Sequence, residues 1–110
     1  METAPRSSEE VIATVVERIA AAVRPTRIIL FGSAARGQSG PDSDLDLLVV
    51  MPDGTHRRHT AQAIYKALGG LGVAKDVVVV TEADVRDHAD NPSLVMYPAL
   101  REGREVYAAG

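Results

Sequence analysis

Two carboxylates placed at alternate positions where a strongly apolar run begins constrain this chain more than any other feature. Asp44 and Asp46 flank Leu45, and β-prone residues continue to Met51. Side chains on a strand alternate between faces, so both carboxylates point to one side, about 7 Å apart. Uncompensated charges among buried leucines are costly, and Mg²⁺ prefers such oxygen ligands. The pair predicts a metal site, although acids at a strand entrance are also often solvated.

A second strand ends abruptly in a turn of small residues upstream of the two acids. The apolar run Arg27 to Phe31 stops at Gly32 and Ser33. A glycine here allows close backbone approach to a phosphate, and the serine adds a hydroxyl donor. Arg36 adds a candidate bidentate phosphate contact. Alone, a Gly-Ser turn is usually only a turn.

The remaining periodicity predicts helices packed on a small mixed sheet, an α/β (α+β) fold. Residues 1–110 fit a single domain, because no repeat or linker interrupts the pattern. The expected helices are Ser8 to Val23, Arg57 to Leu71, a short one capped by Thr81, and Pro92 to Glu102. The expected strands are Arg27 to Phe31, Leu45 to Met51, Asp76 to Val80, and Glu105 to Tyr107.

Composition excludes several classes of function. The formal charge of −3 and pI near 5.5 argue against a nucleic-acid coat protein, which needs a basic excess. The absence of cysteine excludes disulfides and thiolate metal sites. No apolar run approaches the ~18 residues of a membrane span. These features predict a cytoplasmic protein without a membrane partner.

Taken together and in this order, the motifs closely resemble the signature of the minimal nucleotidyltransferases of the DNA polymerase β-like superfamily. That signature is Gly-Ser-x-x-Arg-Gly, followed by Ser-Asp-x-Asp at the start of an apolar strand. The resemblance extends from the leading helix through the strand that begins at Asp76 to the segment Gly103 to Tyr107. It implies the nucleotidyltransferase fold.

The resemblance also implies a role for each motif residue in a mechanism that uses two Mg²⁺ ions and ATP. Asp44, Asp46 and Asp76 would be catalytic metal ligands, with Asp76 helping to activate the acceptor hydroxyl. The nucleotide-binding and supporting residues would be Gly32, Ser33, Arg36 and Ser43. Asp76 has competing interpretations, because Lys75 could pair with it and Glu82 and Asp84 lie nearby.

Family members this small resemble the MntA-type antitoxins of HEPN/MNT toxin–antitoxin pairs. The resemblance therefore implies an adenylyltransferase that transfers AMP from ATP to a tyrosine of a HEPN ribonuclease toxin. Two alternatives remain open: a non-catalytic module that masks its partner in a complex, and an enzyme that modifies a small molecule. A homo- or hetero-oligomer is expected in either case.

Several other polar residues attract notice but are predicted to lie on the surface. His56 and His59 follow a Pro-Asp-Gly-Thr turn at a helix start, which favours a solvated position over a metal site. His88 lies in an acidic stretch with no nucleophile beside it. The three tyrosines are expected to be core or interface aromatics.

Overall fold

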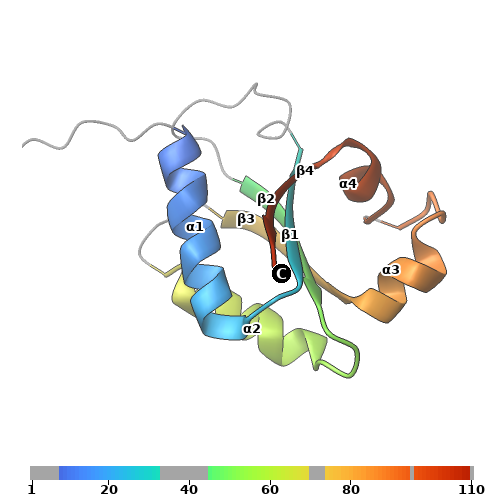
Figure 1. Cartoon of the computed structure of the whole chain (residues 1–110), viewed down its shortest axis with the longest axis horizontal. Helices are drawn as coiled ribbons and strands as arrows, with labels where there is room; N and C mark the ends of the chain where they lie inside the picture. Colours follow the sequence, from blue (N-terminus) through green and yellow to red (C-terminus); the bar gives the residue numbers. More distant parts are fainter. Residues whose placement is uncertain (1–7, 33–44, 70–73, 95, 110) are drawn as a thin grey trace, which may run out of the picture.

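A computed structural model describes residues 8–32, 45–69, 74–94 and 96–109 of the chain (Figure 1). The helices are α1 (Ser8–Val23), α2 (Arg57–Ala67), α3 (Glu82–His88) and α4 (Met96–Glu102). The strands are β1 (Arg27–Phe31), β2 (Leu45–Met51), β3 (Ala74–Thr81) and β4 (Arg104–Ala108).

The four strands form one mixed sheet in the order β3-β2-β1-β4. β1 runs antiparallel to both of its neighbours, β2 and β4, whereas β2 and β3 are parallel. A parallel pair needs a crossover, which α2 supplies here. Figure 1 shows α1 and α2 on one side of the sheet and α3 and α4 on the other. The predicted α/β (α+β) class is confirmed.

The sheet carries a separate apolar cluster on each face. The cluster under α1 and α2 takes the odd-numbered residues of β2, and the cluster under α4 takes Leu48 and Val50. β2 is therefore buried on both faces, which explains why its sequence lacks polar alternation. Asp46 has the parity of Leu48 and Val50, so it lies on the face that α4 covers.

Four predicted elements have boundaries that differ from the structure, and one of them, β4, spans Arg104–Ala108 rather than Glu105 to Tyr107. α2 ends at Ala67, because Leu68 leaves the helical region with φ −93° and ψ 1°. α4 begins at Met96 rather than Pro92, since Asn91 closes a turn by accepting the backbone N–H of Ser93. β3 begins at Ala74 rather than Asp76, because its pairing with β2 starts there.

The predicted helix start at Thr81 is confirmed by its cap. The Thr81 side chain accepts the backbone N–H of Asp84, and the Asp84 carboxylate accepts the backbone N–H of Thr81. This reciprocal capping box satisfies two backbone donors at the N-terminal end of α3. No helix among the described residues combines the length and apolarity needed to cross a bilayer.

Candidate active site

Asp46 on β2 lies directly opposite Asp76 on β3. The ladder between these strands shifts by one residue: Leu45 pairs with Ala74, and Asp46 then pairs with Asp76. Without this irregularity, Asp46 would stand opposite Lys75. The bulge thus aligns two acids of neighbouring strands, which run about 4.8 Å apart. No feature of the sequence signals the bulge.

The two carboxylates differ in their exposure to solvent. Asp46 is half-buried, with its Oδ1 atom shielded from water, whereas Asp76 is exposed. Two acids placed opposite each other repel, and burial of one raises the cost further. A divalent cation would offset that cost, and the open side at Asp76 leaves room for a second molecule to approach.

Gly32 packs against the inner carboxylate from the neighbouring strand. It directly follows Phe31, which is the β1 partner of Asp46. Its φ of +80° lies in the region that favours glycine. A Cβ atom built at Gly32 would lie 2.4 Å from Oδ2 of Asp46, well inside contact distance. The positive φ and the close contact with Asp46 therefore both require glycine at this position.

The other predicted site residues, Ser33, Arg36, Ser43 and Asp44, lie outside the described residues. Within the part of the chain that the structure describes, no group of three or more acidic or imidazole side chains gathers. The described portion of the site is therefore Gly32, Asp46 and Asp76. Its chemistry fits Mg²⁺, which commonly takes one or two protein carboxylates and completes its shell with phosphate oxygens and water.

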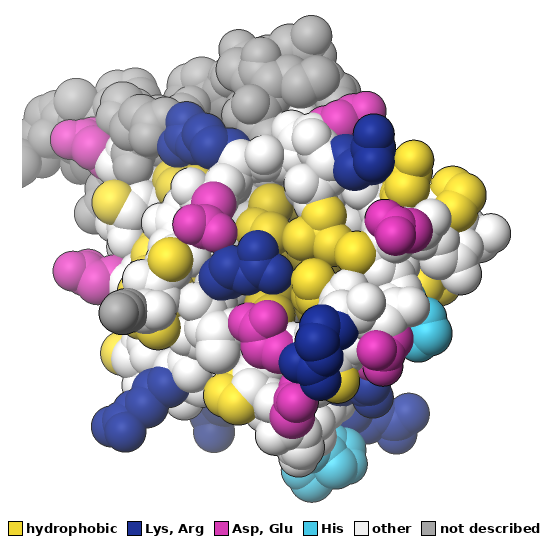
Figure 2. All heavy atoms as spheres, turned by 45° about the vertical axis from the view of Figure 1, so that its right-hand side comes forward, with side chains coloured by type: hydrophobic (Ala, Val, Ile, Leu, Met, Phe, Trp, Pro, Cys, Tyr) yellow, Lys and Arg dark blue, Asp and Glu magenta, His cyan; other side chains and the backbone are white. Residues whose placement is uncertain are grey.

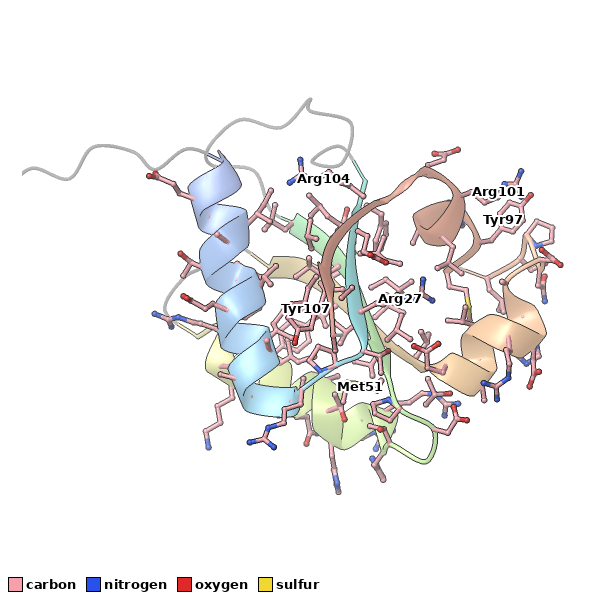
Figure 3. The ribbon with its side chains drawn as sticks, in the orientation of Figure 1. Arg27, Met51, Tyr97, Arg101, Arg104 and Tyr107 are labelled. Atoms are coloured by element: carbon pink, nitrogen blue, oxygen red, sulfur yellow. The ribbon has the colours of Figure 1, made fainter. Side chains whose placement is uncertain are left out.

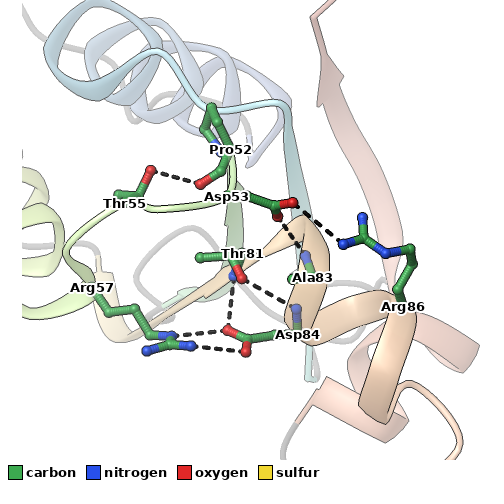
Figure 4. A network of polar contacts seen from close by, with 8 residues as sticks. All are labelled: Pro52, Asp53, Thr55, Arg57, Thr81, Ala83, Asp84 and Arg86. Atoms are coloured by element: carbon green, nitrogen blue, oxygen red, sulfur yellow. Dashed lines mark hydrogen bonds and ion pairs between the residues drawn. The ribbon is translucent and has the colours of Figure 1, made fainter.

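The acids that compete with Asp76 serve the fold instead. Asp84 caps α3 and accepts two hydrogen bonds of 2.8 Å from the Arg57 guanidinium (Figure 4). The pKa of Asp84 is lowered to about 2, and the largest cause is its hydrogen bonding with the Arg57 side chain. Glu82 accepts a hydrogen bond from the Thr26 hydroxyl. Neither carboxylate pairs with a residue of the candidate site in these contacts.

The three histidines named in the sequence analysis all lie on the surface. His56 is the N-cap of α2, and its Nδ1 atom accepts the backbone N–H of His59. The two rings stack with centroids 3.9 Å apart, and both residues are exposed. His88 is exposed at the end of α3. The predicted surface positions of all three are confirmed.

Surface charge on the α3 and α4 side is mixed. Figure 2 shows acidic and basic side chains interspersed around apolar surface on this face. Nucleic-acid-binding proteins typically gather lysine and arginine into a basic patch or stripe. The distribution on this face agrees with the acidic overall balance.

The sequence matches a family model over most of its length. The model is described as "Nucleotidyltransferase domain", and it matches residues 12–97. This range contains Gly32, Asp46 and Asp76. No curated protein matches the sequence.

Solved structures share the fold at low sequence identity. A protein from Sulfolobus solfataricus assigned as a nucleotidyltransferase superposes with a TM-score of 0.60 at 18% identity, covering 90% of this chain and 78% of that one. A toxin–antitoxin structure with AMP-PNP gives 0.55 at 20% identity, covering 89% and 73%. The toxin–antitoxin MntA-HepT gives 0.53 at 18% identity, covering 93% and 74%.

Proposed function

Because this chain belongs to the nucleotidyltransferase domain family, we propose that it is a protein adenylyltransferase that acts as an antitoxin. It transfers AMP from ATP to a tyrosine of a partner HEPN ribonuclease toxin in the cytoplasm. Two similar structures support a toxin as the partner, since they are toxin–antitoxin structures. One of these structures also contains AMP-PNP, an analogue of ATP, which supports ATP as the donor.

The observation that carries the proposal is the alignment of Asp46 with Asp76 beside Gly32. In this proposal Asp44, Asp46 and Asp76 hold two Mg²⁺ ions, which supply positive charge for the phosphates of ATP. Gly32 and Ser33 bind the β- and γ-phosphates through a close backbone approach. Arg36 neutralises phosphate charge, and Ser43 orients the acids.

Transfer requires the tyrosine oxygen to attack the α-phosphorus of ATP. A new P–O bond forms to the tyrosine, the bond from the α-phosphorus to the bridging oxygen breaks, and diphosphate leaves. The tyrosine must lose its proton, and the exposed carboxylate of Asp76 is accessible to take it. Asp46, half-buried and packed against Gly32, instead fixes the geometry of the donor side.

The test uses the protein encoded in the adjacent reading frame as acceptor. It is incubated with this protein, ATP and Mg²⁺, and its intact mass is then measured. We expect its mass to rise by AMP units, with the modification mapped to a tyrosine. The Asp44→Asn/Asp46→Asn variant should leave the mass unchanged, while Asp87→Asn, at an exposed acid on α3, serves as the matched control.

Two results would redirect the proposal. A tight complex with no change in mass would replace catalysis with masking of the partner. Transfer of AMP to a small molecule, with the adjacent protein unmodified, would identify a small-molecule enzyme. Equal transfer by wild type and the double variant would contradict the assignment of the active site.

A further inference from the structure

Tyr65 contacts the edge of the sheet directly beside the candidate active site. This residue lies in the last turn of α2 and is 45% exposed, so it is not one of the core aromatics that the sequence allowed. Its hydroxyl oxygen accepts the backbone N–H of Val77 on β3 at 3.0 Å. Val77 follows Asp76, the exposed acid of the candidate site. The Tyr65 side chain therefore holds the peptide that joins Asp76 to Val77.

The hydrogen bond fixes the orientation of this peptide. β3 pairs with β2 alone among the described strands, and the N–H of Val77 points to Tyr65, away from β2. The C=O and N–H groups of a trans peptide point in opposite directions, so the C=O of Asp76 points toward β2. Tyr65 thus holds the peptide on the side that the ladder leaves open. The orientation of this peptide sets the backbone of Asp76 and hence the direction of its carboxylate.

The strand residues that follow do not by themselves select the alignment of Asp46 with Asp76. β3 continues with four consecutive valines, residues 77–80, and β2 is buried against apolar clusters on both faces. The valines therefore give the same pattern in two registers. In the register without the bulge, Lys75 would stand opposite Asp46, and stability of the fold favours such a pair of opposite charges. A strand whose pattern permits a one-residue slip needs another feature to specify its register.

The Tyr65 hydrogen bond is compatible with only one of these two registers. The backbone N–H groups of successive strand residues point to opposite edges, so a slip by one residue exchanges the two edges. The N–H of Val77 would then point toward β2, and the Tyr65 hydroxyl would lose its donor. The hydrogen bond therefore favours the register that places Asp76 opposite Asp46.

We propose that Tyr65 is a positioning residue for the metal site, because its hydroxyl fixes the register of β3 that holds Asp76 opposite Asp46. This inference rests on the proposed function, in which both acids hold Mg²⁺. In this role Tyr65 touches neither the ion nor ATP. Loss of a group that orients metal ligands from behind commonly lowers metal affinity by about tenfold or more. Affinity for Mg²⁺ is thus the property that Tyr65 controls most directly.

The test compares two changes that each remove a single hydroxyl oxygen. Tyr65→Phe removes it beside Asp76, and Tyr107→Phe removes it on β4, at the opposite edge of the sheet (Figure 3). Calorimetry measures the affinity for Mg²⁺ in the presence of an ATP analogue with a methylene group between its α- and β-phosphates. We expect Tyr65→Phe to lower this affinity about tenfold and Tyr107→Phe to leave it unchanged. Hydrogen exchange of the Val77 amide should be faster in Tyr65→Phe alone.

Lys75 provides a second arm, since it competes for Asp46 in the alternative register. Lys75→Gln should raise the Mg²⁺ affinity of Tyr65→Phe more than that of wild type, because only the weakened register gives Lys75 access to Asp46. Residues that act on one equilibrium have non-additive effects, whereas independent residues have additive ones. Equal effects of Lys75→Gln in the two backgrounds would overturn the proposal.

Two further results would overturn the proposal. Binding of Mg²⁺ by Tyr65→Phe as tight as that of wild type would show that the hydroxyl does not position Asp76. Association of Tyr65→Phe into larger species, with its Mg²⁺ affinity unchanged, would assign Tyr65 to protection of the β3 edge instead. Failure of the proposed function has a different signature: wild type then binds Mg²⁺ with the ATP analogue but transfers no AMP from ATP. The dependence of Mg²⁺ affinity on Tyr65 tests the present inference in that case as well.

Discussion

Asp46 and Asp76 stand opposite each other on parallel strands because β3 carries one extra residue near the start of its pairing with β2. The arrangement places two negative charges at one register position, and one of them is half-buried. Stability of the fold alone favours an opposite charge or an apolar residue there. In the proposed function, this alignment serves the binding of a cation and of the phosphates of ATP.

Neutralising Asp46 or Asp76 should distinguish a role of these acids in stability of the fold from a role in metal binding. Without divalent ions, Asp46→Asn or Asp76→Asn should keep or raise the midpoint of thermal unfolding, because the repulsion between the acids is relieved. Mg²⁺ with ATP should raise the midpoint of wild type but not of these variants, since a ligand stabilises the state that binds it. Asp87→Asn should respond as wild type does. A loss of stability in the metal-free variants would show that the acids serve the fold.

The two glycines with positive φ allow the contact at Gly32 to be isolated. Gly32→Ala and Gly54→Ala both place a side chain in the left-handed region, at φ +80° and +86°, which costs about 1 kcal/mol. Only at Gly32 would the new Cβ meet the Asp46 carboxylate, because nothing lies within 4 Å at Gly54. We therefore expect Gly32→Ala to abolish binding of ATP in calorimetry and Gly54→Ala to preserve it. Comparable binding by both variants would contradict the proposed role.

The Arg57–Asp84 pair makes the stability of the fold depend on pH in the acidic range. The pKa of Asp84 is lowered to about 2 in the folded protein, from 3.8. A depressed folded pKa contributes stability above the unfolded value, and this is lost as the pH falls through the folded value. Asp84→Asn should therefore be less stable than wild type near pH 7, and the difference should shrink between pH 4 and pH 2. Chemical unfolding at several pH values measures it; a constant difference would contradict the linkage.

The end of α1 offers a site for stabilisation. Arg24 follows the helix with φ +54°, a conformation that a residue with a side chain adopts only at a cost, before Pro25 prevents the helix from continuing. Arg24→Gly should raise the free energy of unfolding by about 1 kcal/mol. Arg18→Gly, within the same helix, should lower it by a similar amount. Urea titration of both variants checks the contrast, and a loss of stability in Arg24→Gly would refute it.

Much of the fold is predictable because local signals and burial agree. The apolar period of α1 and the β-rich run of β2 give their observed bounds, and the Thr81 cap starts α3 where predicted. The bulge beside Asp46 is different, because it depends on how two strands align rather than on either strand alone. The contact of Tyr65 with β3 likewise arises only once separate segments pack together.

The most direct test of the central claim follows the phosphorus atoms of ATP. ATP labelled at the α-phosphate or at the γ-phosphate is incubated with this protein, Mg²⁺ and the product of the adjacent reading frame. Nucleotidyl transfer predicts that the α-label becomes bound to that product while the γ-label leaves as diphosphate, and that Asp46→Asn abolishes both events. Label passing from the γ-position to the acceptor, or transfer that persists in Asp46→Asn, would contradict the account.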